Sequence, residues 1–474
     1  MAGSRESKTL RRSHHAAQIY LDHSHDDNTG AVWAQVHPAR WRGAGPIPCV
    51  GPEGGILQCP PAGGPIAIRA GRLFDSKTGQ MLTRQMVILS GERITEVGPQ
   101  AQVKIPAGAL VIDLSQATVL PGLIDAHEHM FNSRRKNETT ESALLIAVQN
   151  AQADLRAGFT AERDMSSHGN GYADVEIRDA INHGRIDGPR FQVSTRGIVL
   201  SAAPAKPAAP DNPLDGQIVR SIEEGRAAVR EQIARGAGWI KVYPTGDYTF
   251  TATGEATYKQ TCPMPVLQAL IDETHLLKKK VACHVMGGEG QKDSIIAGCD
   301  TIEHAFGLNQ EQADLIVRKG LYYDPTLVRY IEPYMDDNDT RNTGGKFRMI
   351  PIFEKAVTMA GATKGLKIMM GSGADGSTYP HGTQALDFEA LVKRASISPS
   401  RAIQAGTTIN AEVMGWQDQV GSLDKGKYAG DPLADITELQ RVKFVMKGGK
   451  VIRNEMGKAL ASNRLRPKAQ EIYS

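Results

Sequence analysis

Residues 120–129 read Leu-Pro-Gly-Leu-Ile-Asp-Ala-His-Glu-His, an apolar run that ends in two histidines one residue apart. If this run is a β-strand, the side chains of His127 and His129 point to the same face. Two imidazoles then meet just beyond the end of the strand. Because neutral imidazole is the commonest metal ligand, the stretch indicates half of a metal site. A single His-x-His pair is a weak signal, so the rest of the chain must supply the other ligands.

The composition bounds the fold and the kind of partner. The chain has 474 residues, 41% of them hydrophobic and 5% aromatic. This is enough for one large core and a smaller companion domain. The 55 Lys and Arg residues nearly balance the 52 Asp and Glu residues, which argues against nucleic acid or an anionic membrane surface as a partner. No apolar run is long enough to span a bilayer. We expect a small-molecule substrate, and a homo-oligomer stays open.

The N-terminal sequence and the cysteines indicate the cellular compartment in which the protein is expected. The first 27 residues lack the apolar segment of a secretory signal. Five cysteines, scattered and odd in number, do not predict a disulfide framework: Cys49, Cys59, Cys262, Cys283 and Cys299. Both features favour a cytoplasmic protein, although a secreted protein that has lost its leader would look the same.

Changes in composition and periodicity along the sequence divide the chain into several parts. Residues 1–64 contain five histidines and a Pro/Gly-rich patch without periodicity, which predicts a flexible leader. Residues 65–120 and 415–455 are rich in short β-runs split by glycine turns, and we expect both to form one small β-sandwich. Residues 121–414 form a larger α/β domain, and residues 456–474 form a C-terminal tail.

In the larger domain, strand-like runs alternate with helical ones, as in a parallel α/β protein. Eight runs begin apolar and end polar, namely residues 120–129, 158–164, 190–197, 238–246, 279–287, 300–307, 320–328 and 366–375. Eight β/α units predict a TIM-like (β/α)8 barrel, in which catalytic groups lie at the C-terminal ends of the strands. The polar residues of this chain fall at those ends.

Side chains that bind metals end five of these strands. They are His127, His129, Lys241, His284, His304 and Asp375. Each has an ordinary structural explanation when taken alone, such as a histidine bonded to the backbone or an aspartate in a Gly-rich turn. Their joint occurrence at the ends of the predicted strands favours one shared site at the mouth of the barrel.

Seven motifs carry a resemblance to a known family. They are PGLIDAHEH, TAERDM, GPRFQVSTR, WIKVY, ACHVMG, TIEHAFG and YPHG, and the resemblance covers roughly residues 66–455. With them the chain resembles the binuclear-metal branch of the amidohydrolase superfamily, in particular its imidazolonepropionase-like, Xaa-Pro dipeptidase and ochratoxinase-like group. The resemblance implies a hydrolase of carbon–nitrogen bonds that uses a hydroxide bridging two divalent ions. Zinc suits such nitrogen- and carboxylate-rich ligands.

The resemblance also implies a role for each metal-binding side chain. One ion lies between His127, His129 and Asp375, and the other between His284 and His304. Lys241 is carbamylated by CO₂ and bridges the two, because a carbamate is anionic and has one oxygen for each ion. Asp375 takes the proton of the hydroxide and passes it to the leaving amine.

Further residues are expected to bind the substrate or support the site. Tyr243 lies two residues after Lys241, so it shares the face of the lysine and is expected to bind a substrate carboxylate. Arg196 and His381 are weaker candidates for the same task. A structural salt bridge for Arg196 and a loop-capping role for His381 are equally good interpretations. Asp164 is expected to support the site without binding metal.

The chain departs from the family pattern in three places. Strand eight usually ends in Gly-Thr/Ser-Asp-Ala-Gly, but residues 371–376 read Gly-Ser-Gly-Ala-Asp-Gly, so Asp375 comes two residues late. In the family an acidic residue and a short apolar strand usually stand before Gly-Asp-Pro, but in this chain Gly430 follows Ala429 without them. One strand of the small sandwich is therefore missing or shortened, and an edge is exposed. Residues 201–213 replace a Gly-rich loop after strand three, where barrels set their substrate choice.

We therefore expect a metallopeptidase of the dipeptidase or carboxypeptidase kind, which cleaves an Xaa-Pro-like dipeptide or an N-acyl amino acid such as an ochratoxin-type amide. Two alternatives stay open. The same site could act on a cyclic amide, an imidazolone or a lactone, because the fold does not decide the bond. The chain could also be a non-catalytic scaffold, an interpretation that the displaced Asp375 favours and the five other ligands oppose.

Overall fold

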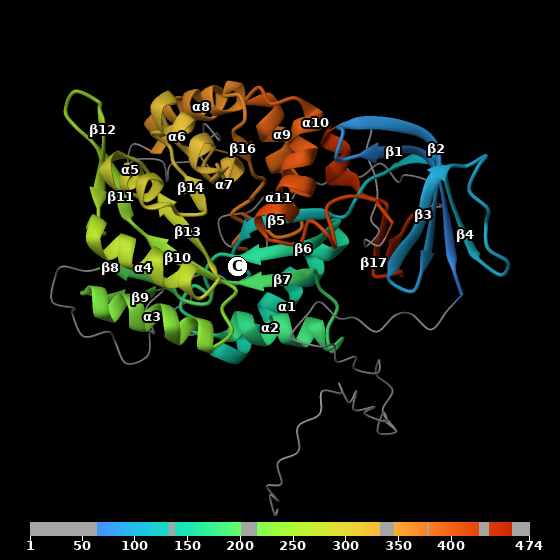
Figure 1. Ribbon diagram of the computed structural model, residues 1–474, viewed down its shortest axis with the longest axis horizontal. Coiled ribbons are helices and arrows are strands. Elements are labelled where there is room, and N and C mark those ends of the chain that lie inside the picture. Colours follow the sequence, from blue (N-terminus) through green and yellow to red (C-terminus); the bar gives the residue numbers. More distant parts are fainter. Residues whose placement is uncertain are drawn as a thin grey trace, which may run out of the picture. The chain divides into compact units, whose positions relative to one another are not determined.

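The structure is a computed structural model, and it describes residues 64–131, 138–200, 216–331, 346–376, 379–425 and 436–456 (Figure 1). The chain separates into two compact units, Met1–Ala44 and Gly45–Ser474, and all described residues belong to the second. The predicted leader up to residue 63, the loop at 201–213, the shortened segment at 429–431 and the tail from residue 457 lie outside the described residues. None of the described helices is both long enough and apolar enough to cross a membrane.

Four strands near the start of the described chain form one sheet. In the order β3-β2-β1-β4 they are β3 (Arg93–Pro99), β2 (Gln80–Ser90), β1 (Ile66–Asp75) and β4 (Leu110–Val119). β1 pairs antiparallel with β2 and parallel with β4. Both faces of the sheet bury apolar side chains, because successive residues of a strand point to opposite sides: Val87 and Leu89 lie in one apolar cluster, and Met86 and Ile88 lie in another.

The end of the chain contributes to the same small domain. β17 (Phe444–Lys447) and β18 (Lys450–Asn454) form a hairpin that turns at Gly448 and Gly449. Both glycines have a positive φ, 53° and 73°, which a residue without a Cβ adopts readily. Phe444 and Met446 of the hairpin are buried in one apolar cluster with side chains of β1, β2 and β4. Residues far apart in the sequence therefore share this core.

Eight parallel strands form the barrel, and each lies within one of the eight predicted runs. They are β5 (Leu123–Glu128), β6 (Phe159–Asp164), β7 (Arg190–Val193), β10 (Trp239–Tyr243), β13 (Lys280–Val285), β14 (Thr301–His304), β15 (Tyr322–Asp324) and β16 (Lys367–Ile368). β5, β6 and β7 pair in one sheet, and β10, β13, β14, β15 and β16 pair in another. Backbone hydrogen bonds continue between the sheets, from Gly238 N to Val193 O at 2.9 Å and from Ala126 N to Met370 O at 3.1 Å. The predicted TIM-like barrel is confirmed.

Four further strands were not predicted. β8 (Gly197–Leu200) and β9 (Gly216–Val219) extend the second sheet beside β10. β11 (Thr245–Phe250) and β12 (Ala256–Gln260) form a separate hairpin after β10. β8 and β9 have only four residues each, which is too short for a clear period, and the sequences of β11 and β12 are largely polar.

Helices separate the strands and surround the barrel (Figure 1). They are α1 (Thr140–Arg156), α2 (Ala173–Asn182), α3 (Ile222–Ala234), α4 (Met264–Leu276), α5 (Gly288–Ala297), α6 (Gln310–Lys319), α7 (Leu327–Ile331), α8 (Lys346–Ala362), α9 (Leu386–Lys393), α10 (Pro399–Gln404) and α11 (Asn410–Val413). Side chains of Thr139, Ser221 and Asn309 accept a backbone N–H at the starts of α1, α3 and α6, as N-caps do.

The alternation of side chains along β10 explains how the barrel positions a lysine. Ile240 and Val242 are fully buried in the apolar cluster that includes Leu267 and Leu270 of α4. Because successive side chains of a strand point to opposite faces, Lys241 points away from this layer and into the barrel.

Two cysteines form a disulfide that the sequence did not predict. Cys283 of β13 is bonded to Cys299, which lies just before β14, and their Cα atoms are 6.0 Å apart. β13 and β14 are neighbours in the sheet, so the fold brings together two residues that are 16 positions apart. The expectation that the cysteines form no disulfide is wrong for this pair. Cys262 is a buried free thiol.

Glu162 of β6 is a buried acid whose hydrogen-bonding capacity the surrounding barrel residues do not satisfy. Neither oxygen of its carboxylate has a hydrogen-bond partner among the described residues. Burial raises the pKa of Glu162 well above its usual value of 4.5, and the charges of Asp154 and Glu128 raise it further. The ionised form is therefore disfavoured in the folded protein.

We expect Glu162→Gln to stabilise the fold by about 1–3 kcal/mol at neutral pH, because folding must keep this buried carboxyl protonated, whereas the amide is neutral in both the folded and the unfolded state. A carboxyl group with a raised folded pKa loses stability as the pH rises above its unfolded value near 4.5. The advantage of the variant should therefore grow from pH 5 upward, by at most about 1.4 kcal/mol per pH unit. Urea unfolding between pH 5 and 8 measures it, with Glu176→Gln on the exposed side of α2 as the control. An advantage that shrinks toward pH 8 would contradict this.

Candidate metal centre

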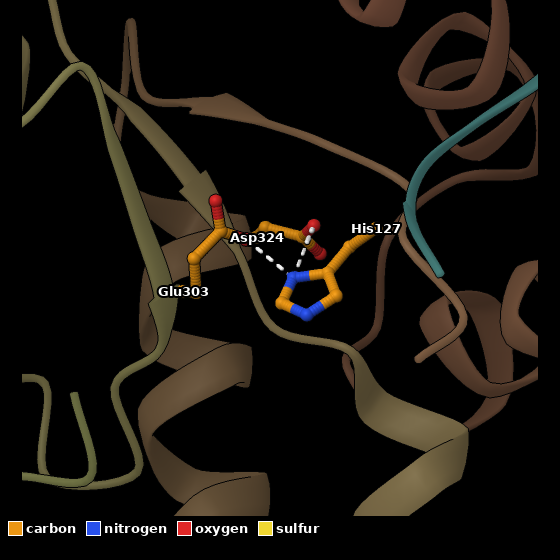
Figure 2. A group of neighbouring side chains, drawn as sticks. All are labelled: His127, Glu303 and Asp324. Carbon is orange, nitrogen blue, oxygen red and sulfur yellow. Dashed lines mark hydrogen bonds and ion pairs between the residues drawn. The ribbon is translucent and has the colours of Figure 1, made fainter. Parts of the chain in front are cut away.

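The ring of His127, a residue of β5, faces Glu303 of β14 and Asp324 of β15 (Figure 2). His127 Nδ1 is 2.7 Å from Glu303 Oε2 and 3.7 Å from Asp324 Oδ2, and all three side chains are fully buried. Because the Glu303 carboxylate accepts, the ring proton is on Nδ1. Nε2 keeps its lone pair and lies 3.4 Å from Nζ of Lys241.

These three residues form a group whose ligand atoms all lie within 4.8 Å of one another, so they are able to hold a metal ion themselves. Glu303, however, is also bonded to Arg163 Nη2 at 3.0 Å and to the hydroxyl of Thr301. Burial raises the pKa of Glu303, but the Arg163 guanidinium and His127 bring it below its usual value. A carboxylate held by these contacts fixes the orientation of the His127 ring through its Nδ1. Nε2 of His127 is therefore a better metal ligand than the Glu303 carboxylate.

His129 and His304 present their rings in the same way. His129 Nδ1 is 3.3 Å from the carbonyl oxygen of Ser166, which accepts. His304 Nδ1 is 2.5 Å from Oγ1 of Thr326, whose own proton goes to the carbonyl of Pro325 at 2.7 Å. In both rings the proton is thus on Nδ1, and the Nε2 lone pair is left for a metal.

The four predicted imidazoles lie around Lys241. Ring centroids are 5.3 Å apart for His127 and His129, 5.0 Å for His127 and His304, and 4.6 Å for His284 and His304. Burial, followed by neighbouring positive charges, lowers the pKa of every one of these rings, that of His127 to about 3. The imidazoles are therefore neutral near pH 7, which is the state that binds metals.

Lys241 is fully buried beside these rings. Burial lowers the pKa of Lys241 to about 8, although Glu303 opposes the shift. A much larger fraction of this lysine is therefore uncharged near pH 7 than of a lysine in water, whose pKa is about 10.4. A neutral amine does not repel a nearby cation, so Lys241 is compatible with a metal site.

The backbone is unusual where β14 ends. His304 and Ala305 have φ values of 68° and 43°, in the left-handed region that residues with a Cβ rarely adopt. The turn is held by Ala305 N, which donates to the carbonyls of Val285 and Glu303 at 2.8 and 2.9 Å. Such strain is concentrated at functional sites, and here it accompanies the contact of His304 with Thr326.

Asp375, the predicted ligand from strand eight, lies in an ion pair. Its Oδ2 is 2.8 Å from Nη1 of Arg329, and its Oδ1 accepts the backbone N–H of Tyr379 at 3.2 Å. The strand-eight segment does contact β5, since Ala374 O accepts the backbone N–H of His129 at 2.7 Å. The role of Asp375 as a metal ligand and proton carrier stays a prediction.

Two predicted substrate-binding residues lie in different surroundings. The ring of Tyr243 is 4.8 Å from that of His284, so the structure brings this residue to the site. Arg196 bonds to Tyr172, which in turn donates to Glu231 Oε1 at 2.8 Å. These contacts agree with the structural interpretation of Arg196, and its part in substrate binding stays a prediction.

His381 lies behind His129. Its Nδ1 is 2.6 Å from Asp154 Oδ2, and its Nε2 is 3.1 Å from the carbonyl oxygen of His129. Burial lowers the pKa of His381, but Asp154 raises it above its usual value overall. A protonated His381 donates from both nitrogens, and these contacts favour the capping alternative over contact with a substrate. Asp164 accepts the backbone N–H of Ser166 at 3.0 Å, in agreement with a supporting role.

The sequence analysis missed several residues of this site. The ring of His168 stacks on that of His129 at 4.0 Å, and its Nδ1 is 3.0 Å from the carbonyl of Phe131. His168 follows the end of β6, so its position after a barrel strand was an available signal. Glu303 and Arg163 are charged residues within short strands of the barrel that are buried along their whole length, and a charge inside such a strand was a further signal.

Residues 118–452, most of the chain, match the amidohydrolase family, and the chain belongs to it. It is 28% identical to ochratoxinase of Aspergillus niger in an alignment of 419 residues that covers 79% of this chain and 84% of that protein. A solved Xaa-Pro dipeptidase with bound methionine in its active site is also 28% identical, with a TM-score of 0.71 over 82% of this chain and 99% of that one. The crystal structure of A. niger ochratoxinase is 25% identical, with a TM-score of 0.69 over 82% and 96%.

These comparisons confirm the predicted family and the predicted class of enzyme. The chain is a hydrolase that acts on amide bonds. The family as a whole binds metal, and the buried donors around His127 are suited to hold one.

Proposed function

We propose that this chain is a metal-dependent amidohydrolase that cleaves the amide bond of a small substrate, either a dipeptide of the Xaa-Pro kind or an N-acyl amino acid. The observation that carries the proposal is the state of the imidazoles. In His127, His129 and His304 the Nδ1 proton goes to an oxygen acceptor, and Nε2 is left for a metal. The similarity to an ochratoxinase and an Xaa-Pro dipeptidase supports the substrate class.

The donor set fits divalent ions, and its imidazoles favour zinc. His127 and His129 would hold one ion, and His284 and His304 the second. Lys241 would lie between them as a carbamate. Bound ions supply an activated water as nucleophile and polarise the scissile carbonyl.

The protein's own residues prepare this chemistry. Near pH 7 a minority of the buried Lys241 is a neutral amine, and this form would react with CO₂, forming an N–C bond and releasing one proton to give the anionic carbamate. Glu303 fixes the ring of His127 and increases its basicity. Tyr243, whose ring lies 4.8 Å from that of His284, would donate a hydrogen bond to a substrate. Asp375 would take the proton of the attacking water and pass it to the leaving amine.

The function is tested with zinc-loaded protein in bicarbonate buffer and a panel of Xaa-Pro dipeptides and N-acyl amino acids. We expect turnover of at least one class, and loss of that turnover after removal of the metal with a chelator. His183→Ala, which changes a histidine bonded to its own helix at Asp179, is the control for histidine loss and should keep activity. His284→Ala should lose it.

The panel also separates the alternatives. Turnover of a lactone, an imidazolone or a cyclic amide in place of the linear amides would contradict the substrate class and keep the metal hydrolase. No turnover, with no metal retained after reconstitution, would contradict the proposed function and favour a scaffold.

A further inference from the structure

The loop between β6 and α2 brings a further histidine against one of the metal-binding rings. β6 ends at Asp164 and α2 begins at Ala173, so this loop lies at the C-terminal end of a barrel strand. In it, the ring of His168 stacks on that of His129, with the centroids 4.0 Å apart and the planes inclined by 22°. The ring of His127, in contrast, meets that of His129 at 77° and 5.3 Å. Of these two neighbours, His168 is the one that lies flat on His129.

The hydrogen bond at Nδ1 is longer for His129 than for its counterparts. It is 3.3 Å long and goes to the neutral carbonyl of Ser166. The corresponding distance is 2.7 Å for His127, whose acceptor is a carboxylate, and 2.5 Å for His304. N–H···O bonds in proteins are usually about 2.7–3.2 Å long, and a charged acceptor strengthens them. The contact at Nδ1 alone therefore orients His129 less firmly than the other two rings.

His168 is tied to the chain segment that carries His129. Its Nδ1 is 3.0 Å from the carbonyl oxygen of Phe131, two residues after His129. Because the carbonyl accepts, the proton of His168 is on Nδ1. A hydrogen bond in the plane of the ring and a stack on its face thus fix His168 relative to His129.

The backbone of the loop is both strained and well bonded. Ser166 and His168 have φ values of 146° and 43°, which residues with a Cβ rarely adopt. The N–H of Ser166 donates to Asp164 Oδ1 at 3.0 Å. Nδ2 of Asn170 donates to the carbonyls of Ser167 and His168 at 3.0 and 3.3 Å. Such a conformation persists only where the surrounding structure imposes it, so the fold holds His168 over His129.

Capping of the loop alone does not account for the stack. The contact with the Phe131 carbonyl needs one N–H donor, which an asparagine or a glutamine also supplies. A parallel ring adds dispersion contact across the face of the neighbouring ring. This contact restrains the plane of the His129 ring, and the direction of the lone pair on Nε2 depends on that plane.

We infer that His168 is a positioning residue for the first ion, because it stacks on His129 and fixes the direction in which Nε2 of His129 presents its lone pair. The inference rests on the proposed function, in which His127 and His129 hold that ion. Groups that orient a metal-binding histidine change the metal affinity about 10–100-fold. The stack is with His129, so it bears on the first ion and not on the second.

The test measures the zinc affinities of His168→Ala and His168→Phe by chelator competition, without any substrate. His168→Ala should weaken one of the two ions about 10–100-fold and leave the other within about threefold. His168→Phe, which keeps a flat ring, should recover most of the affinity. If His168→Ala does not fold, His168→Leu, which fills the space without a flat ring, takes its place.

The matched control is His183→Ala. His183 is also half-buried, and its Nδ1 likewise lies near a backbone carbonyl, that of Asp179, at 2.6 Å. Its replacement should leave the affinities for both ions unchanged. Unchanged affinities in His168→Ala, an equal weakening of both ions, or an equal loss in His168→Phe would overturn the inference.

The measurement also separates this inference from the proposed function. Turnover does not enter it, so a chain that binds two zinc ions without hydrolysing any substrate still tests His168. A wild type that binds no zinc contradicts the proposed function, and NMR of the metal-free protein then decides about His168. The Cε1–H signal of His129, identified by its loss in His129→Gln, should move downfield in His168→Ala and keep its position in His168→Phe. An unmoved signal in His168→Ala would overturn the inference.

Discussion

Replacement of Lys241 by methionine is expected to remove bound metal and to lower kcat/KM on the order of 10³-fold. Lys241 is fully buried, and its Nζ lies 3.4 Å from Nε2 of His127. If its carbamate bridges two ions, its loss leaves both with fewer ligands and with two positive charges facing each other. Elemental analysis of the purified variant, together with its turnover of the best substrate, measures the effect.

The control for this experiment is Lys280→Met. Lys280 lies at the start of β13, is half-buried, and donates from Nζ to the carbonyl of Val413 at 2.6 Å. Its replacement removes a lysine from a barrel strand at the end away from the imidazoles, and should leave metal content and turnover close to those of the wild type. A Lys241→Met protein with full metal content and turnover would show that the lysine does not bridge the ions.

Glu303→Gln is expected to weaken metal binding about 10–100-fold, because the carboxylate that orients His127 from behind is lost. The same change leaves the fully buried Arg163 without a charged partner, since Glu303 Oε1 lies 3.0 Å from its Nη2. Breaking a buried pair in this way costs about 3–5 kcal/mol. Chelator competition measures the zinc affinity, and urea unfolding of the metal-free protein measures the stability.

Glu354→Gln provides the matched comparison. Glu354 pairs with Arg394 at 3.1 Å, but both side chains are about one third exposed, so the pair is worth about 0–1 kcal/mol. Its loss should change neither the zinc affinity nor, to any great extent, the unfolding midpoint. Equal effects of the two substitutions would mean that the Glu303 network is an ordinary ion pair without influence on the metal centre.

The barrel and most of its site could be predicted from the sequence because both depend on local patterns. An apolar run predicts each strand, and a polar residue at the end of a strand predicts each candidate ligand. The rule that parallel strands of a barrel share one mouth then brings His127, Lys241 and His304 together without any coordinates. β5, Leu123–Glu128, lies within the predicted run 120–129 for the same reason.

The side chains behind the ligands could not be predicted in this way. Glu303 bonds to a residue 176 positions away, and no periodicity links the two. Asp375 and Arg329 pair across two neighbouring βα units, so the sequence shows only that the aspartate is displaced and not which cation holds it. The Cys283–Cys299 disulfide depends likewise on which strands are neighbours, and not on the number of cysteines.

The central claim is that four neutral imidazoles and Lys241 form a metal centre. Elemental analysis of the wild-type chain, reconstituted with zinc in bicarbonate and freed of excess ions, tests it most directly. The proposed site predicts about two zinc ions per folded chain. A folded chain that retains none would contradict it.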